Sequence, residues 1–121
     1  MKKSYIPITL FLVVASIIYA SWFVMNNQSS QKPVIIIMKA DKFEPETVQI
    51  KKGTKVIFKN EDQVDRWPAS NLHPTHGIYP EFDPQKPVPV GTSWEFTFDK
   101  VGTWKYHDHL IPSIRGVIVV S

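Results

Sequence analysis

Residues Gly102 to Val119 read GTWKYHDHLIPSIRGVIV, and this segment contains two strand-like runs around a short loop. The run 103–108 alternates polar and aromatic residues, whereas the run 117–120 is continuous and β-branched. Both patterns are typical of β-strands, in which successive side chains point to opposite faces. If the strand includes His109, one of its faces carries Trp104, Tyr106 and Asp108. The opposite face then carries Thr103, Lys105, His107 and His109.

The two histidines of this segment fall on the same predicted face. His107 and His109 are separated by one residue, so an extended strand directs both imidazoles to one side, where they can bind one metal ion or two neighbouring ions. Asp108 lies between them on the aromatic face. A carboxylate there needs an ion-pair partner, a proton, a metal ion or a place at the rim of the core.

The segment resembles the C-terminal copper loop of the cupredoxin family, whose pattern is Tyr-x-Cys-x-x-His-Pro-x-Met-x-Gly followed by an apolar strand. The matching positions are Tyr106, Pro112 and Gly116. The cysteine, histidine and methionine ligand positions hold Asp108, Ile111 and Ile114 instead. The His-Asp-His triplet is also similar to the His-Cys-His of multicopper oxidases, whose flanking histidines bind a separate copper cluster. The resemblance thus implies the cupredoxin fold without its usual copper centre.

The resemblance extends to the first half of the domain. From Phe43 to Asp62 the sequence follows the cupredoxin series Phe-x-Pro-x-x-Val-x-Ile-x-x-Gly-Thr-x-Val-x-Phe-x-Asn-x-Asp. We expect further strands at 34–38, 47–51, 54–60 and 92–98, the first of them buried on both faces. The predicted fold is therefore all-β: a cupredoxin-like Greek-key β-sandwich over 34–121, preceded by one N-terminal transmembrane helix.

The chain of 121 residues contains no cysteine, which excludes disulfides, iron–sulfur sites and thiolate copper sites. The net charge of +3 arises outside the predicted domain, because Lys2, Lys3 and Lys32 precede it while all 11 acidic residues lie within it. The domain itself is neutral. A nucleic-acid partner, which requires a basic surface, is therefore not expected.

The N-terminus predicts a membrane anchor over residues 1–25. Lys2 and Lys3 precede an uncharged, mostly apolar run from Tyr5 to Met25, which as a helix would be about 31 Å long. A cleaved signal peptide is the alternative, although no small-x-small cleavage site precedes Ser21. In both cases the positive-inside rule places the domain on the extracytoplasmic side, periplasmic or at the cell surface. Polar residues 26–33 are expected to form a flexible linker.

All four histidines of the chain occur in two pairs. The first pair, His73 and His76, lies in the proline-rich stretch 61–90, which we expect to be a long irregular loop with a function. In cupredoxins the loops that carry the two pairs meet at one end of the sandwich, so the resemblance implies that both pairs lie at that end; the sequence does not decide whether they share one metal site. Imidazole without sulfur suits Cu(II), Zn or Ni. The predicted metal ligands, for copper or alternatively zinc, are His73, His76, His107, His109 and Asp108, with Asp83 and Glu81 as further oxygen donors.

Simpler interpretations of the same residues also exist. The histidines can be ordinary solvated strand and turn residues, and Asp108 can hold its loop closed by accepting backbone N–H groups. Ile111 and Ile114 at the usual ligand positions indicate that hydrocarbon, rather than metal, fills the blue-copper cavity.

Three functions are compatible with these patterns. The first, which we predict, is a membrane-anchored protein that binds, buffers or transfers copper, without blue-copper electron transfer because the thiolate is absent. The second is a metal-free module whose proline-rich loop docks a protein partner in or near the membrane. The third is an enzyme in which self-association builds a copper cluster at an interface; we do not expect catalysis from a lone domain.

Overall fold

The computed structural model describes residues 8–26 and 31–121. The chain divides into two compact units, one that contains helix α1 (Ile8–Asn26) and one that begins at Gln31. An N-terminal helix is thus present as predicted. Among the described residues, however, no helix is both long and apolar enough to span a membrane. Residues 1–7 of the predicted anchor and 27–30 of the predicted linker lie outside the described ranges.

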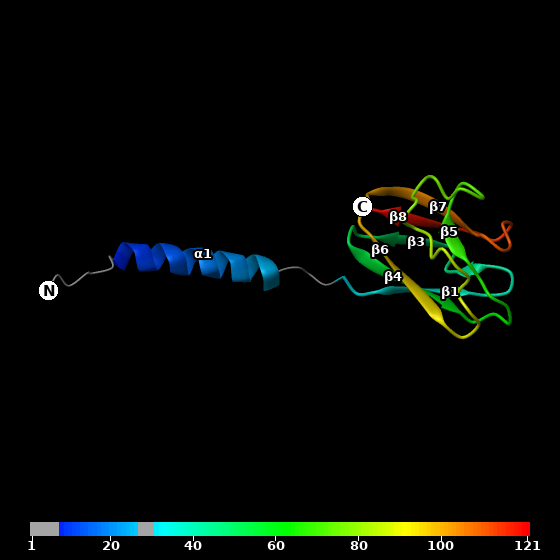
Figure 1. Cartoon of the computed structure of the whole chain (residues 1–121), viewed down its shortest axis with the longest axis horizontal. Coiled ribbons are helices and arrows are strands. Elements are labelled where there is room, and N and C mark those ends of the chain that lie inside the picture. Colours follow the sequence, from blue (N-terminus) through cyan, green and yellow to red (C-terminus); the bar gives the residue numbers. More distant parts are fainter. Residues whose placement is uncertain (1–7, 27–30) are drawn as a thin grey trace. The chain divides into compact units, whose positions relative to one another are not determined.

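The second unit is a sandwich of two four-stranded sheets (Figure 1). Its strands are β1 (Val34–Met38), β2 (Phe43–Glu44), β3 (Thr47–Ile50), β4 (Thr54–Asn60), β5 (Pro68–Ser70), β6 (Ser93–Phe98), β7 (Gly102–Asp108) and β8 (Arg115–Val120). The order is β2-β1-β4-β6 in one sheet and β3-β8-β7-β5 in the other. Both sheets are mixed, because β1 runs parallel to β4 and β3 runs parallel to β8. The predicted all-β sandwich is confirmed.

The core lies between the two sheets and is rich in aromatic side chains. Alternation along β4 buries Val56 and Phe58 completely. Phe58 packs against Phe82 and Tyr106, with ring centroids 5.6 Å apart in each pair. Burying each such side chain stabilises the fold by about 1.5–3 kcal/mol. The prediction that β1 is buried on both faces is wrong: Ile35 is 53% exposed, because its sheet is covered on one face only.

The stretch 61–90 contains a strand that the sequence did not predict. All three residues of β5 are buried, and they pair with β7 at the edge of the second sheet. Pro68 begins the strand, a position that tolerates proline, and three residues are too few to show a period of two. The register places Ala69 opposite His107. Because the pairing is antiparallel, the start of β5 lies beside the end of β7, and the residues after β5 begin beside Lys105.

Gly116 shows why the C-terminal pattern requires glycine. A Cβ atom at this position would lie 2.4 Å from Cζ of Tyr106, closer than nonbonded atoms approach. The Tyr106 ring is fully buried and packs against Phe43, with ring centroids 4.6 Å apart. Because Tyr106 on β7 is paired with Gly116 on β8, this contact fixes the strand that carries His107.

Candidate metal centre

The structure brings the two histidine pairs together. One nitrogen from each imidazole lies within 4.8 Å of the corresponding atoms of the other three, in the group His73, His76, His107 and His109. His73 Nδ1 is 3.2 Å from His107 Nε2. His76 Nε2 is 3.0 Å from His109 Nδ1. Each close contact thus joins one histidine of the loop after β5 to one histidine at the end of β7.

Local structure explains why these imidazoles converge. His107 lies in β7 and His109 in the bend that follows it, and their ring centroids are 6.4 Å apart. His76 is buried, and its backbone is held by the Ser70 hydroxyl, which donates to the His76 carbonyl at 2.7 Å. Its φ of 55° lies in the left-handed region, which few non-glycine residues adopt, although histidine does so more often than most. His73 is exposed at the outer side of the cluster.

Two of the imidazoles are oriented by neighbouring oxygen atoms. Asp83 Oδ2 lies 2.6 Å from His76 Nδ1, and Asn71 Oδ1 lies 3.0 Å from His107 Nδ1. Each oxygen accepts a hydrogen bond when the proton is on Nδ1, which leaves the Nε2 lone pair directed into the cluster. Metal-binding histidines in proteins are oriented in this way by carboxylate or carbonyl oxygens. Such orientation is not needed by solvated histidines.

Burial favours the neutral form of His107 and His109, which is the form that a metal requires. Burial, reinforced by repulsion from His76 and the other imidazoles, lowers the pKa of His107 to about 4. The same causes lower the pKa of His109. Burial alone would raise the pKa of Asp83, but hydrogen bonds from Gln85 N–H, His76 and Trp67 lower it overall, so the carboxylate that orients His76 is ionised.

The metal-free protein is therefore expected to lose stability in mild acid. The pKa of His107 falls from 6.5 in the unfolded chain to about 4 in the fold, so the unfolded state binds the extra proton and stability decreases as pH falls between these values. Between pH 7 and pH 5 the loss from this residue is about 2 kcal/mol, since one pKa unit corresponds to about 1.4 kcal/mol. Urea unfolding with chelator present at both pH values measures it. A His107→Asn variant that shows the same pH dependence would contradict the assignment.

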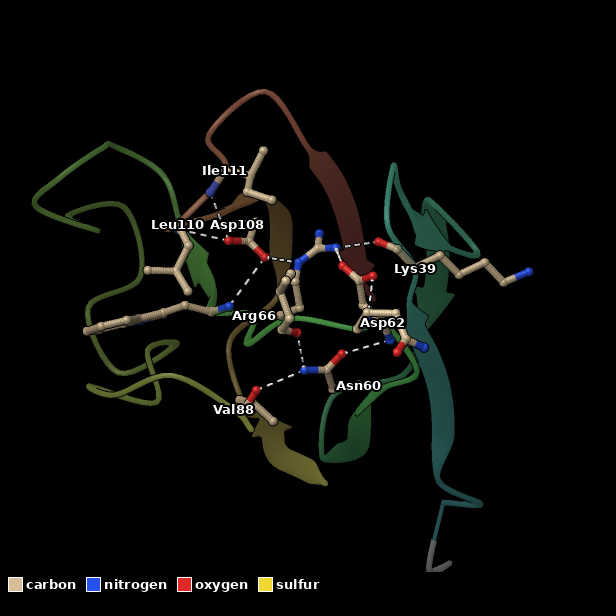
Figure 2. A network of polar contacts seen from close by, with 11 residues as sticks. Lys39, Asn60, Asp62, Arg66, Val88, Asp108, Leu110 and Ile111 are labelled. Atoms are coloured by element: carbon tan, nitrogen blue, oxygen red, sulfur yellow. Dashed lines mark hydrogen bonds and ion pairs between the residues drawn. The ribbon is translucent and has the colours of Figure 1, made fainter. Parts of the chain in front are cut away.

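Asp108 does not join the histidine cluster, and its prediction as a ligand is replaced by another role. Its side chain is fully buried. Oδ1 accepts hydrogen bonds from the backbone N–H groups of Leu110 and Ile111 at 2.8 and 3.0 Å. Oδ2 accepts from Arg66 Nε at 2.5 Å and from the Trp67 N–H at 3.3 Å (Figure 2). With both oxygens satisfied by donors, Asp108 closes the loop after β7.

Arg66 occupies the interior beside Asp108. Its side chain is fully buried, and Nη1 donates to Asp62 Oδ2 at 2.9 Å and to the Lys39 carbonyl (Figure 2). Arg66 follows shortly after the Asn-x-Asp at the end of β4. In cupredoxins, the first copper-binding histidine occurs near this position in the sequence. Asp108 is at the cysteine position. Where the family would place copper, this chain thus has an ion pair.

The two isoleucines complete this replacement. Ile114 is 7% exposed and belongs to the core, and Ile111 packs against the core. The expectation of hydrocarbon at the usual histidine and methionine positions agrees with this packing. Glu81, considered as an oxygen donor, pairs instead with Lys100 at 3.1 Å on the surface.

Neither Asn71 nor Arg66 was predicted from the sequence as part of the site. Asn71 follows a strand that is itself hard to predict, and an amide gives no pattern of its own. The one sequence feature that pointed to a partner such as Arg66 was Asp108, because a carboxylate on the aromatic face requires a buried cation or hydrogen-bond donor.

The donor set fits a single transition-metal ion. Bonds from copper or zinc to imidazole nitrogen are about 2.0–2.1 Å, so nitrogens on opposite sides of one ion are about 4 Å apart. Side-chain rotations that shorten the largest separation from 4.8 Å to this value would let all four nitrogens reach one ion. Nitrogen donors without sulfur suit Cu(II) and Zn(II).

Comparisons with known proteins agree with the fold. The family described as cupredoxin-like domain matches residues 10–120. A purple cupredoxin from Nitrosopumilus maritimus is 26% identical, with 73% of this chain and 99% of that chain covered and a TM-score of 0.64. A reduced amicyanin variant is 20% identical, covering 78% of this chain and 87% of its own, also with a TM-score of 0.64.

A copper-containing nitrite reductase from Thermus scotoductus SA-01 is 24% identical, with a TM-score of 0.61, and the match covers 74% of this chain but 22% of that protein. No curated protein matches the sequence. Because the family match extends over nearly all of the sandwich and agrees with its strands, the chain belongs to the cupredoxin-like domain family.

Proposed function

We propose that the domain binds one copper ion through His73, His76, His107 and His109, in order to store it or to transfer it to another molecule. The observation that supports this most strongly is the convergence of four imidazole nitrogens within 4.8 Å. Oxygen partners orient two of these imidazoles from outside the cluster. We propose copper rather than zinc because similar structures include an amicyanin in a Cu(I) form and a copper-containing nitrite reductase.

The chain's own residues suit binding and exchange better than electron transfer. The thiolate that tunes blue copper is missing, because the chain has no cysteine. Bound copper would supply a redox-active cation with nitrogen ligands only. His76 and His107 are buried and would form the fixed side of the site, whereas exposed His73 is the ligand that an incoming donor or acceptor molecule can reach.

Electron paramagnetic resonance tests this proposal. Cu(II) is titrated into the full chain in mild detergent, and we expect uptake of one equivalent with hyperfine splitting from nitrogen. A variant with all four histidines replaced by alanine is the negative control, and Lys105→Ala, which changes an exposed residue of the same strand, is the matched positive control. Equal uptake by the wild type and the four-alanine variant would rule the proposal out. Competition with Zn(II) then decides which metal the site prefers.

The metal-free module is the second candidate, and the filled interior favours it. The Arg66–Asp108 pair and Ile114 occupy the region where the family would place copper. A protein partner that co-purifies with the wild type and equally with the four-alanine variant would support this function. A partner lost with the histidines would instead connect docking to the metal site.

We also propose that the N-terminal segment attaches the domain to a membrane, with the domain on the extracytoplasmic side. Helix α1 contains no charged residue, and its apolar side chains, such as Leu10, Phe11 and Phe23, are more than half exposed and need an apolar environment. Lys2 and Lys3 supply the positive flank. Carbonate extraction of membranes tests the attachment. Release of the full chain into the supernatant, as for a variant without residues 1–25, would exclude it.

A further inference from the structure

Trp67 connects the buried ion pair to the histidine cluster. We infer that Trp67, held by the Arg66–Asp108 pair, is a positioning residue that sets His76 and His109 in place before any metal arrives. This inference rests on the proposed metal function and adds to it the part of the chain that preorganises the site. It also gives a role to the ion pair that stands where the family would bind copper.

The backbone of Trp67 lies between Asp108 and His109. Its N–H donates to Asp108 Oδ2 at 3.3 Å, and its carbonyl accepts from the His109 N–H at 2.7 Å. Asp108 also accepts the N–H groups of Leu110 and Ile111 just beyond His109. The peptide that carries the His109 imidazole is therefore tied on both sides to one buried carboxylate and one tryptophan.

The side chain of Trp67 reaches the first histidine pair. Its indole Nε1 donates to Asp83 Oδ1 at 2.8 Å, and the other oxygen of the same carboxylate lies 2.6 Å from His76 Nδ1. The indole ring also packs on the His109 imidazole, with ring centroids 4.6 Å apart at 45°. One residue thus restrains a histidine from each pair, through a carboxylate in one case and by direct contact in the other.

The Arg66–Asp108 pair supports the backbone of Trp67 rigidly. A contribution to the stability of the fold does not by itself explain why the pair is present. Both side chains are fully buried. Figure 2 shows the contact between them. Removing two charges from water costs several kcal/mol per ion, and well-packed apolar residues are often as stabilising as a buried pair. Arg66 Nη2, moreover, has no hydrogen-bond partner among the described residues. The burial of this ion pair costs free energy and leaves one donor of Arg66 without a partner. We therefore attribute the pair to the geometry that it imposes on neighbouring residues.

Replacing Trp67 by phenylalanine tests the side-chain contacts. The change removes the indole N–H from Asp83 and keeps a ring against His109. Trp104→Phe is the matched control, because Trp104 Nε1 also donates one hydrogen bond, to the Lys100 carbonyl at 2.8 Å, away from the cluster. We expect Cu(II) affinity of the full chain to fall by about 10–100-fold in W67F, the range for residues that orient metal ligands, and by less than twofold in W104F. The Cu(II) paramagnetic resonance spectrum should change in W67F only.

A measurement without metal separates this inference from the proposed function. Nuclear magnetic resonance of the metal-free full chain should show a His76 Nδ1–H proton that exchanges slowly in the wild type and in W104F and is lost in W67F. If the wild type binds no copper but this proton behaves as stated, the metal function fails and the positioning role stands. If the proton persists in W67F, or if W67F binds copper as the wild type does, the inference is overturned.

A second variant tests whether the Arg66–Asp108 pair supports Trp67. In R66M/D108L the ion pair is replaced by apolar residues, so the fold is expected to persist while the restraint on Trp67 and His109 is lost. We expect weaker Cu(II) binding and a heterogeneous resonance spectrum. Wild-type affinity and spectrum in this double variant would overturn the role of the pair. Should the double variant not fold, W67F alone decides.

Discussion

Arg66→Ala is expected to lower the free energy of unfolding by about 3–5 kcal/mol, because it leaves the buried Asp108 carboxylate without its cation. Asp62 loses its partner as well, since Arg66 Nη1 lies 2.9 Å from Asp62 Oδ2. Small domains have total stabilities of about 5–15 kcal/mol, so this loss removes a large fraction. Urea unfolding of the full chain, followed by tryptophan fluorescence, measures the change.

Two comparisons make this prediction specific. Arg115→Ala removes an exposed arginine of β8 and is expected to change stability by less than about 0.5 kcal/mol. The R66M/D108L variant is expected to be more stable than Arg66→Ala, because only Asp62 then lacks its cation, whereas Arg66→Ala leaves both Asp62 and Asp108 without one. An Arg66→Ala variant as stable as Arg115→Ala would mean that the interior pair is not what the geometry indicates.

His107→Ala is expected to lower Cu(II) affinity by more than about 100-fold, beyond the range for residues that only orient ligands. His107 is 2% exposed and is held by Asn71, so water cannot replace it in the same geometry. His73→Ala, at the exposed side of the cluster, should have a smaller effect. Competition titrations with a chromophoric chelator give both affinities. If His73→Ala lowered Cu(II) affinity more than His107→Ala, this would contradict the division of the histidine cluster into a fixed side and an exchangeable side.

The fold was predictable because its residues act locally or through short patterns. The series from Phe43 to Asp62 sets alternating strands around the turn at Gly53, and Gly116 permits the close approach of Tyr106. The strand period also placed His107 and His109 on one face. By contrast, β5 was too short to show a period, and the exposed face of β1 depended on what covers its sheet.

The four histidines of the candidate site were predictable from the sequence, and the residues that surround them were less so. Histidines are few and paired, so the four imidazoles could be proposed from spacing together with the family resemblance. The contact between Asp108 and Arg66 was not predictable, because the two residues are 42 positions apart in the chain and no local pattern connects them. Asn71 and Trp67 act through contacts that only the folded loops create. Partners of this kind belong to tertiary structure, whereas periodicity reports on single elements.

X-ray absorption at the copper edge of the loaded full chain tests the central claim most directly. The spectrum reports the number and kind of atoms bound to copper. Four imidazoles predict about four nitrogen neighbours near 2.0 Å, with the outer-shell scattering of histidine rings and no sulfur near 2.3 Å. A spectrum dominated by oxygen, with fewer than three imidazoles, would contradict the assignment of this cluster as the metal site.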